Sequence, residues 1–141
     1  MKVPEHPALD ECLRAGVLCN ESQLLRKDGH LNVQGDPTEA ALVVAGEKGG
    51  LMHAKTHQAA PCLDTIPFES EHMFRATLHE TRKGRITYRV GAVERLLPRC
   101  IDALGKHDEL VHWTKRPSIE PLNKWPGAVC AFWPWPATMW G

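Results

Sequence analysis

The sequence predicts an α+β domain in which helices flank an antiparallel β-sheet. Two segments, 8–18 and 37–48, have the apolar spacing or the capping residues of helices. Residues 74–90 contain two alternating runs joined by a glycine turn, a pattern typical of a β-hairpin and therefore of antiparallel pairing. A length of 141 residues suits one domain with one core, so we expect the helices and the sheet to pack as layers.

The first expected element is a helix over residues 8–18, which Pro7 opens. Its apolar stripe consists of Leu9, Leu13, Val17 and Leu18. A loop at 20–22 follows, and the Lys-Asp-Gly sequence at 27–29 predicts a turn before a short strand at 31–34.

The most clearly marked element is the helix in GDPTEAALVVAGEKGG. Asp36 suits its N-cap, Pro37 its first turn, and Glu39 the position that completes a capping box. The two glycines at the end of the segment terminate it. Residues 51–61 have no clear period and fit either a helix or a loop.

The β-sheet is expected between residues 62 and 90. Residues 62–68 form one candidate strand, and the hairpin follows with its turn at Lys83-Gly84 and its return strand at 85–90. In its first strand, one face carries Phe74, Ala76 and Leu78, and the other carries Arg75, Thr77 and His79. A helix over about 93–104 is expected next.

Composition changes abruptly near the C-terminus. All five tryptophans follow His112, together with a group of prolines. This change divides the chain into a core over 1–112 and a Trp/Pro-rich segment over 113–141, with a possible last strand at 128–133. The remaining tail fits either a divergent C-terminus or a segment translated out of frame.

Composition excludes several functional classes. The 17 basic and 17 acidic residues balance, which does not favour binding to nucleic acid or to an anionic membrane. The five cysteines form no C-x-x-C pair, which argues against a zinc ribbon and favours a reducing, cytosolic setting. No apolar run approaches the length of a membrane span, and charged residues near the N-terminus argue against a signal peptide.

Four short segments occur in an informative order: VLCNES, GDPTEAAL, IPFESEH and VGAVERLLPRC. In this order and spacing, they resemble the nucleotide-binding domain of P-type cation-transporting ATPases of the calcium, sodium and magnesium type. The resemblance covers about residues 7–110. Each motif is weak alone, but four in series are specific.

The resemblance implies that this segment is the ATP-binding, cytoplasmic domain of an integral membrane pump. In that family, a separate phosphorylation domain carries the aspartate that accepts the γ-phosphate of Mg-ATP. Its Asp-Lys-Thr-Gly-Thr motif is absent here. The segment should therefore have no catalytic residues, hydrolyse no ATP by itself, and cooperate with phosphorylation and actuator domains rather than with a membrane or nucleic acid.

The resemblance also implies which residues bind the nucleotide. Glu39 matches the glutamate that accepts a hydrogen bond from adenine, although it could equally serve only the capping box. Phe68 matches the phenylalanine on which adenine stacks, although a lone phenylalanine is normally a core residue. Ser70 lies in the same segment. Gly91 matches a glycine at which the backbone approaches the ligand, or it simply joins a strand to a helix.

The sequence departs from the family at its phosphate-binding cations. Val90 stands where the family has a lysine, and Arg89 should point to the opposite face of the strand. Met73 replaces another polar or cationic residue, and Ala128 replaces an arginine. Each charge-assisted contact is worth about 1.5–3 kcal/mol. We therefore expect a base-dominated site of millimolar or weaker affinity.

One other function is open, and a third, a metal-binding module, is disfavoured. The missing cations and the Trp-rich end also fit a degenerate relative that binds no nucleotide and serves as a protein-interaction module. His53 and His57 have the i, i+4 spacing of metal ligands on a helix, but no third ligand is evident, so no metal site is expected.

Overall fold

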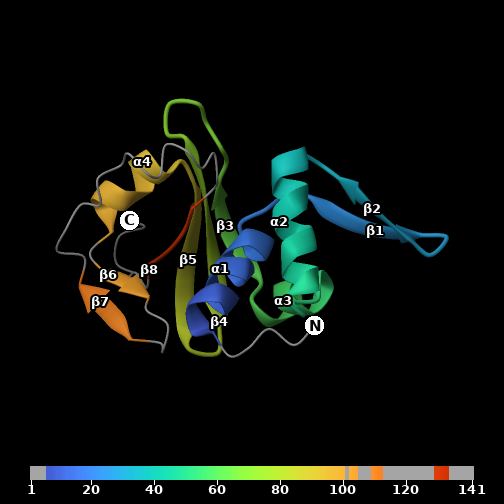
Figure 1. The fold of residues 1–141 in the computed structure, drawn as a ribbon, viewed down its shortest axis with the longest axis horizontal. Coiled ribbons are helices and arrows are strands. Elements are labelled where there is room, and N and C mark those ends of the chain that lie inside the picture. The colour runs from blue at the N-terminus through green and yellow to red at the C-terminus, as the bar shows by residue number, and fades with distance from the viewer. Residues whose placement is uncertain (1–5, 101, 105–108, 113–128, 134–141) are drawn as a thin grey trace.

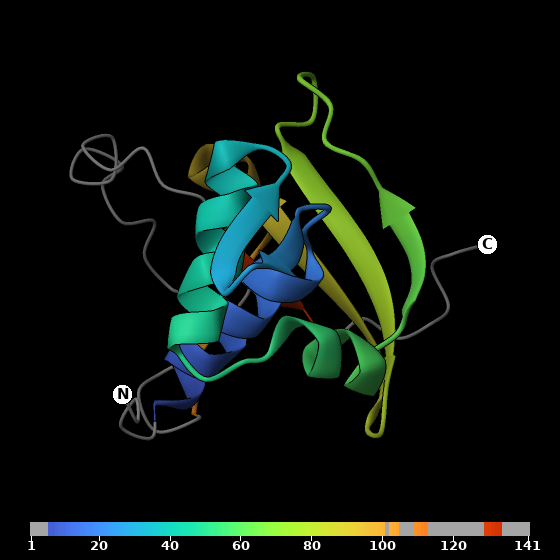
Figure 2. The same ribbon diagram turned by 90° about the vertical axis from the view of Figure 1, so that its right-hand side faces the viewer.

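The computed structural model describes residues 6–100, 102–104, 109–112 and 129–133. Its centre is a four-stranded antiparallel sheet with the strand order β3-β4-β5-β8. Helices α1, α2 and α3 lie on one side of this sheet, and α4 and the β6–β7 ribbon lie on the other (Figures 1 and 2). The α+β class predicted from the sequence is confirmed.

Helix α1 spans Pro7–Leu18, as predicted, and packs against α2. Val17 and Leu18 are fully buried, but Leu9 is 42% exposed and does not extend the stripe. The two helices approach closely because Gly46 faces Val17, and a Cβ at position 46 would collide with that side chain. At Gly46, α1 is therefore held against the C-terminal part of α2.

Helix α2 spans Pro37–Lys48, and its N-terminus is only partly the predicted capping box. The Asp36 carboxylate accepts hydrogen bonds from the backbone N–H groups of Thr38 and Glu39, at 2.8 and 3.4 Å. The Glu39 carboxylate does not complete the box but turns toward other partners, which are described below. The capping of α2 therefore leaves Glu39 available for another role.

A two-stranded ribbon precedes α2 and projects from the body of the molecule (Figure 1). Strand β2, His30–Gln34, was predicted, whereas β1, Gln23–Lys27, was not. Strand β1 becomes a strand by pairing antiparallel with β2 along its whole length, across the predicted Asp28-Gly29 turn. The ambiguous segment after α2 contains helix α3, His53–Ala59.

The predicted hairpin is confirmed. Strand β4, Phe74–Thr81, pairs with β5, Gly84–Gly91, without a break in register, and the shorter β3, Cys62–Ile66, pairs with β4 on the other side. Beyond β5, the strand β8, Val129–Trp133, extends the sheet. The other residues of the segment 113–141, including Ala128 and the tail, lie outside the described residues, so the expected domain division stays a prediction.

The helix expected over 93–104 is wrong in its length. Helix α4 spans only Val93–Leu96, a 3₁₀ turn follows at Leu97–Arg99, and strand β6, Asp102–Leu104, then pairs with β7, Leu110–His112. Pro98 explains the early end, because proline cannot donate the next helical hydrogen bond and its ring clashes with the preceding turn.

Both faces of β4 are buried. Phe74 and Ala76 pack with Leu96 of α4, whereas Tyr88 and Val90 of β5 pack against α1. The alternate residues of β4 lie under the helices although they are polar: Arg75 is 7%, Thr77 4% and His79 0% exposed. The two faces of β4 therefore lie in different buried environments: one face packs against apolar side chains, and the other carries polar side chains that form hydrogen bonds.

His79 illustrates the hydrogen-bonded environment. Its Nδ1 donates to the Ala60 carbonyl at 2.8 Å, so in the neutral ring Nε2 accepts from the Thr77 hydroxyl at 2.9 Å. Burial lowers the pKa of His79 below its ordinary value of 6.5. Burial and the neighbouring His53 also lower the pKa of His57.

These lowered pKa values predict that stability falls in mild acid. The unfolded chain gains protons first as the pH falls, so the stability present above about pH 6.5 is lost below it, by up to about 1.4 kcal/mol per pH unit per histidine. The free energy of unfolding in urea should be measured at several pH values between 7.5 and 5, a range that includes the ordinary histidine pKa of about 6.5. His79→Gln should reduce the slope, whereas His30→Gln, at an exposed position, should leave it unchanged. A slope unaffected by His79→Gln would contradict the account.

Candidate functional site

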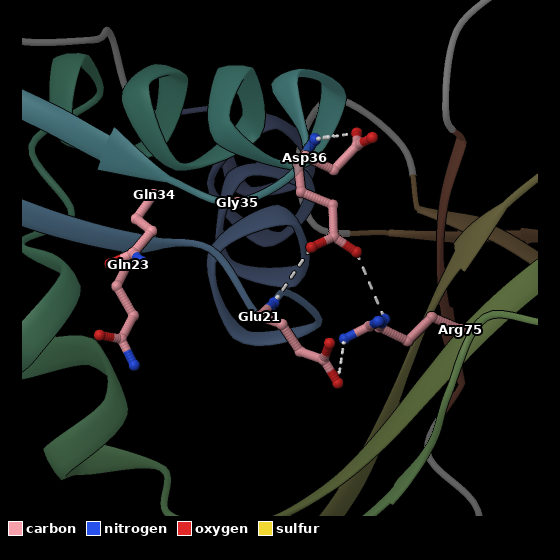
Figure 3. A pocket seen from close by; sticks show the side chains of 7 residues that line it. Glu21, Gln23, Gln34, Gly35, Asp36 and Arg75 are labelled. Atoms are coloured by element: carbon pink, nitrogen blue, oxygen red, sulfur yellow. Dashed lines mark hydrogen bonds and ion pairs between the residues drawn. The ribbon is translucent and has the colours of Figure 1, made fainter.

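A cavity of about 520 Å³ lies where the N-terminus of α2, the β1–β2 ribbon and the start of β4 meet (Figure 3). Its size is within the range of small-molecule sites. Apart from Gly35, the residues that line it have polar or charged side chains: they are Glu21, Gln23, Gln34, Gly35, Asp36, Glu39 and Arg75. The cavity thus offers hydrogen-bond donors and acceptors to a ligand with a polar edge.

Asn20 positions the α2 side of this cavity. Its side-chain amide donates to the carbonyl of Gly16 at 3.1 Å and to that of Glu39 at 2.7 Å, and its carbonyl accepts from the Ser22 backbone at 2.7 Å. The residue is 9% exposed, so these bonds are shielded from water. Asn20 therefore ties the end of α1 to the first turn of α2 and fixes the backbone of Glu39.

The Glu39 carboxylate lies in the wall of the cavity. One oxygen accepts from the backbone N–H of Glu21 at 3.3 Å, and the other lies 3.4 Å from Nε of Arg75. The Glu39 side chain is 25% exposed. A carboxylate held by two neighbours, with part of its surface free, can still accept a hydrogen bond from a ligand.

Arg75 is the functional candidate that the sequence interpretation missed. It projects from the start of β4 toward Glu21, whose carboxylate oxygen lies 2.9 Å from its Nη1 (Figure 3). Burial lowers the pKa of the guanidinium, but Glu21 and Glu39 outweigh burial and raise it above its ordinary value. The sequence signal that could have identified it is a charged residue within the alternating pattern of residues 74–79.

Phe68 and Ser70 lie in the loop between β3 and β4. Both are exposed, Phe68 by 55%, so Phe68 is not a core residue. The loop turns tightly because the Glu69 carbonyl accepts from the backbone N–H groups of His72 and Met73, at 3.1 and 2.8 Å. The loop thus presents an aromatic ring to solvent just before β4.

Met73, Val90 and Gly91 meet where β4 begins and β5 ends. The Met73 carbonyl accepts from the N–H of Ala92 at 2.9 Å, and Gly91 pairs with Phe74. Val90 is 8% exposed and packs in the core against α1. Of the six residues predicted to bind nucleotide, all of which are described, only Glu39 lines the cavity. Met73, Val90 and Gly91 meet at the start of β4, and Phe68 and Ser70 lie in the exposed loop that precedes it.

Arg89 lies on the opposite face of the sheet from Val90, as strand alternation requires. Its guanidinium carbon is 5.5 Å from the centre of the Phe74 ring, and that of Arg99 is 5.7 Å from the same ring. Val90 instead faces α1, where its cross-strand neighbour is Arg75. Arg89 therefore does not supply a cation at the position of Val90.

The histidine pair lies apart from this cavity on α3. The His53 and His57 rings are 4.5 Å apart, and Nε2 of His57 lies 3.2 Å from the Val17 carbonyl oxygen. Within the described ranges, no group of three or more potential ligands could hold a metal ion. The same part of the chain contains no helix long and apolar enough to cross a membrane.

The fold and the cavity define an α+β domain with a polar ligand-sized site beside a capped helix. A family model described as the cytoplasmic domain N of P-type ATPases matches residues 8–120. The chain belongs to this P-type ATPase family, as the sequence motifs predicted.

Its relatives include proteins named as cation-transporting or calcium-transporting ATPases. The chain is 45% identical over 105 residues to the cation-transporting ATPase pma1 of Synechocystis sp., a match that covers 74% of this chain and 12% of the relative. It is 35% identical over 103 residues to a probable cation-transporting ATPase F of Mycobacterium bovis, covering 73% and 11%. It is 32% identical over 100 residues to a calcium-transporting ATPase of Bacillus subtilis, covering 70% and 11%. The chain thus spans about a tenth of the length of these relatives.

Proposed function

We propose that this chain is the ATP-binding domain of a P-type cation-transporting ATPase. Glu39 accepts a hydrogen bond from the exocyclic amine of adenine, and Phe68 stacks on the base. The observation that carries the proposal is the Glu39 carboxylate in the wall of a ligand-sized cavity: the Glu21 backbone N–H and Arg75 hold the carboxylate, and Asn20 holds the Glu39 backbone. The exposed ring of Phe68 supports it, because an aromatic face free of core contacts is available for stacking.

The domain contributes placement to the reaction of the parent pump. Phosphoryl transfer depends mainly on positioning and electrostatics, so a domain that holds the base can direct the γ-phosphate of Mg-ATP toward a separate phosphorylation domain. An actuator domain and a membrane part complete the proposed pump. The parent would couple ATP hydrolysis to cation transport, whereas this segment alone would hydrolyse no ATP.

The affinity should depend on the base rather than on the phosphates. Val90 is buried in the core and Met73 carries no charge, so neither supplies a cation to a triphosphate. Titrations of ATP and of AMP, followed by NMR chemical shifts, should give dissociation constants within about threefold of each other, in the millimolar range or weaker. A preference for ATP of more than about tenfold would show that phosphate contacts exist.

The second candidate is a degenerate relative that acts as a protein-interaction module. It is favoured by the ion pair of Arg75 with Glu39, which engages the carboxylate that the base would need. The same titrations separate the two functions. If neither nucleotide shifts any resonance at concentrations on the order of tens of millimolar, the interaction module replaces the ATP-binding domain as our conclusion.

A further inference from the structure

Two arginines approach the same aromatic ring on the α4 side of the sheet, away from the cavity (Figure 1). The guanidinium carbons of Arg89 and Arg99 lie 5.5 and 5.7 Å from the centre of the Phe74 ring. Arg89 belongs to β5, and Arg99 to the 3₁₀ turn that follows α4. The fold therefore brings two positive charges from successive elements to one place.

The two arginines have no counter-charge among the described residues, where no carboxylate forms an ion pair with either guanidinium. His72 provides a contrast. Its ring centre is 5.9 Å from that of Phe74, but its Nε2 lies 3.5 Å from a carboxylate oxygen of Glu69. The Phe74 ring attracts both guanidinium groups, yet it carries no net charge and so cannot neutralise them. Two positive charges therefore remain uncompensated at this point.

The two guanidinium groups repel each other and are accessible to a ligand. Burial lowers the pKa of Arg89, and the nearby Arg99 lowers it further. Arg99 is exposed and Arg89 is half-buried, so both can be reached from solvent, unlike the fully buried Nε and Nη1 of Arg75. An anion in contact with both groups would replace one repulsion with two attractions.

The chemistry of the two groups selects the ligand. A guanidinium presents parallel N–H donors that match the oxygens of a carboxylate or a phosphate. A single carboxylate would neutralise only one of the two charges, whereas a phosphate group carries close to two negative charges near neutral pH and has several acceptor oxygens. A phosphate dianion therefore matches this pair in both charge and hydrogen-bonding capacity.

We propose that Arg89 and Arg99 form a binding site for a phosphate dianion on the α4 side of the sheet. The site is separate from the cavity lined by Glu39 and goes beyond the proposed function. Its ligand is either free inorganic phosphate or the phosphate group of a small phosphomonoester. Both guanidinium groups donate hydrogen bonds to the phosphate oxygens, while Phe74 keeps the two side chains beside each other.

The test is an NMR titration of the unaltered protein with inorganic phosphate and, separately, with glycerol 3-phosphate. Ionic strength is held constant with sodium chloride, which removes general effects of salt. Inorganic phosphate should shift the backbone and side-chain N–H resonances of Arg89 and Arg99, with a dissociation constant on the order of millimolar. Equal shifts with glycerol 3-phosphate would extend the site to phosphomonoesters, whereas shifts with inorganic phosphate alone would identify the free ion as the ligand. No shift with either compound would overturn the proposal.

Arg99→Gln tests the role of the pair. Arg99 is exposed, so this variant should fold, and its affinity for phosphate should fall about tenfold. Arg85→Gln, at an exposed arginine of β5 paired with Glu80, is the matched control and should bind phosphate as the unaltered protein does. If Arg99→Gln binds phosphate as tightly as the control, the proposal is overturned.

Two further measurements separate this site from a structural role and from the adenine site. Saturating phosphate should raise the urea midpoint of the unaltered protein and of Arg85→Gln but not of Arg99→Gln, because a ligand stabilises only the protein that binds it. Arginines that merely stack on Phe74 would give no such difference. AMP added at saturating phosphate should still shift Glu39 and Phe68, since their site is separate. A loss of those shifts would contradict two independent sites.

Discussion

Phe68→Ala is expected to weaken AMP binding by about tenfold to a hundredfold while leaving the stability of the domain almost unchanged. Stacking of an aromatic side chain on a base is worth about 1–3 kcal/mol, and each ~1.4 kcal/mol corresponds to a factor of ten. The Phe68 ring is 55% exposed in a surface loop, so its removal leaves no cavity in the core. NMR titration measures the affinity, and urea unfolding measures the stability.

Leu63→Ala is the control for this prediction. Leu63 lies on β3, is 47% exposed, and is thus an apolar residue of similar exposure in the element that precedes the loop. Its removal should not change AMP affinity, and Phe68→Trp should retain binding because a larger aromatic face still stacks. Equal affinity of Phe68→Ala and the unaltered protein would show that the ring is not the stacking platform.

Gly91→Ala is expected to destabilise the domain by about 3 kcal/mol or more. A Cβ at this position would collide with the carbonyl oxygen of Met73 and lie 2.5 Å from the Cα of Phe74. Both are backbone atoms, one in the residue before β4 and one in its first residue, and they cannot move without breaking the pairing of β4 with β5 or the hydrogen bond from Ala92 to Met73. The midpoint of urea unfolding should fall accordingly.

Gly49→Ala separates this effect from the mere addition of a methyl group. A Cβ at position 49 would lie 2.5 Å from Cδ1 of Leu13, which is the end of a flexible side chain. Leu13 can change its rotamer, so this variant should lose at most about 1 kcal/mol. If the two alanine variants were equally stable, the close approach of the strands at Gly91 would not be the reason for glycine there.

The sequence predicts those parts of the fold whose causes are local. The helix α2 is predicted because its cap, its first-turn proline and its terminal glycines are adjacent in sequence. The β4–β5 hairpin is predicted because alternation and a glycine turn lie within one short segment. Phe68 and Glu39 are indicated by family motifs, and their placement in an exposed loop and in a cavity wall is consistent with the proposed role.

The remaining features depend on contacts between distant segments. Strand β1 has little strand character and exists because β2 pairs with it. The polar face of β4 is buried because three helices cover it, which alternation cannot reveal. Arg75 gains its position in the cavity from Glu21 before β1 and Glu39 on α2, so no local pattern predicts that an arginine and a carboxylate would share one wall.

The most direct test of the central claim is the map of amide chemical-shift changes on titration with AMP. If the cavity binds the base, the shifts should concentrate at Glu21, Glu39 and Arg75 around the cavity and at Phe68 in the β3–β4 loop. All of these shifts should fit the same dissociation constant, in the millimolar range. The contrary result is a set of shifts that avoids these residues, or no shifts at all. Either would show that the domain does not hold adenine at this cavity.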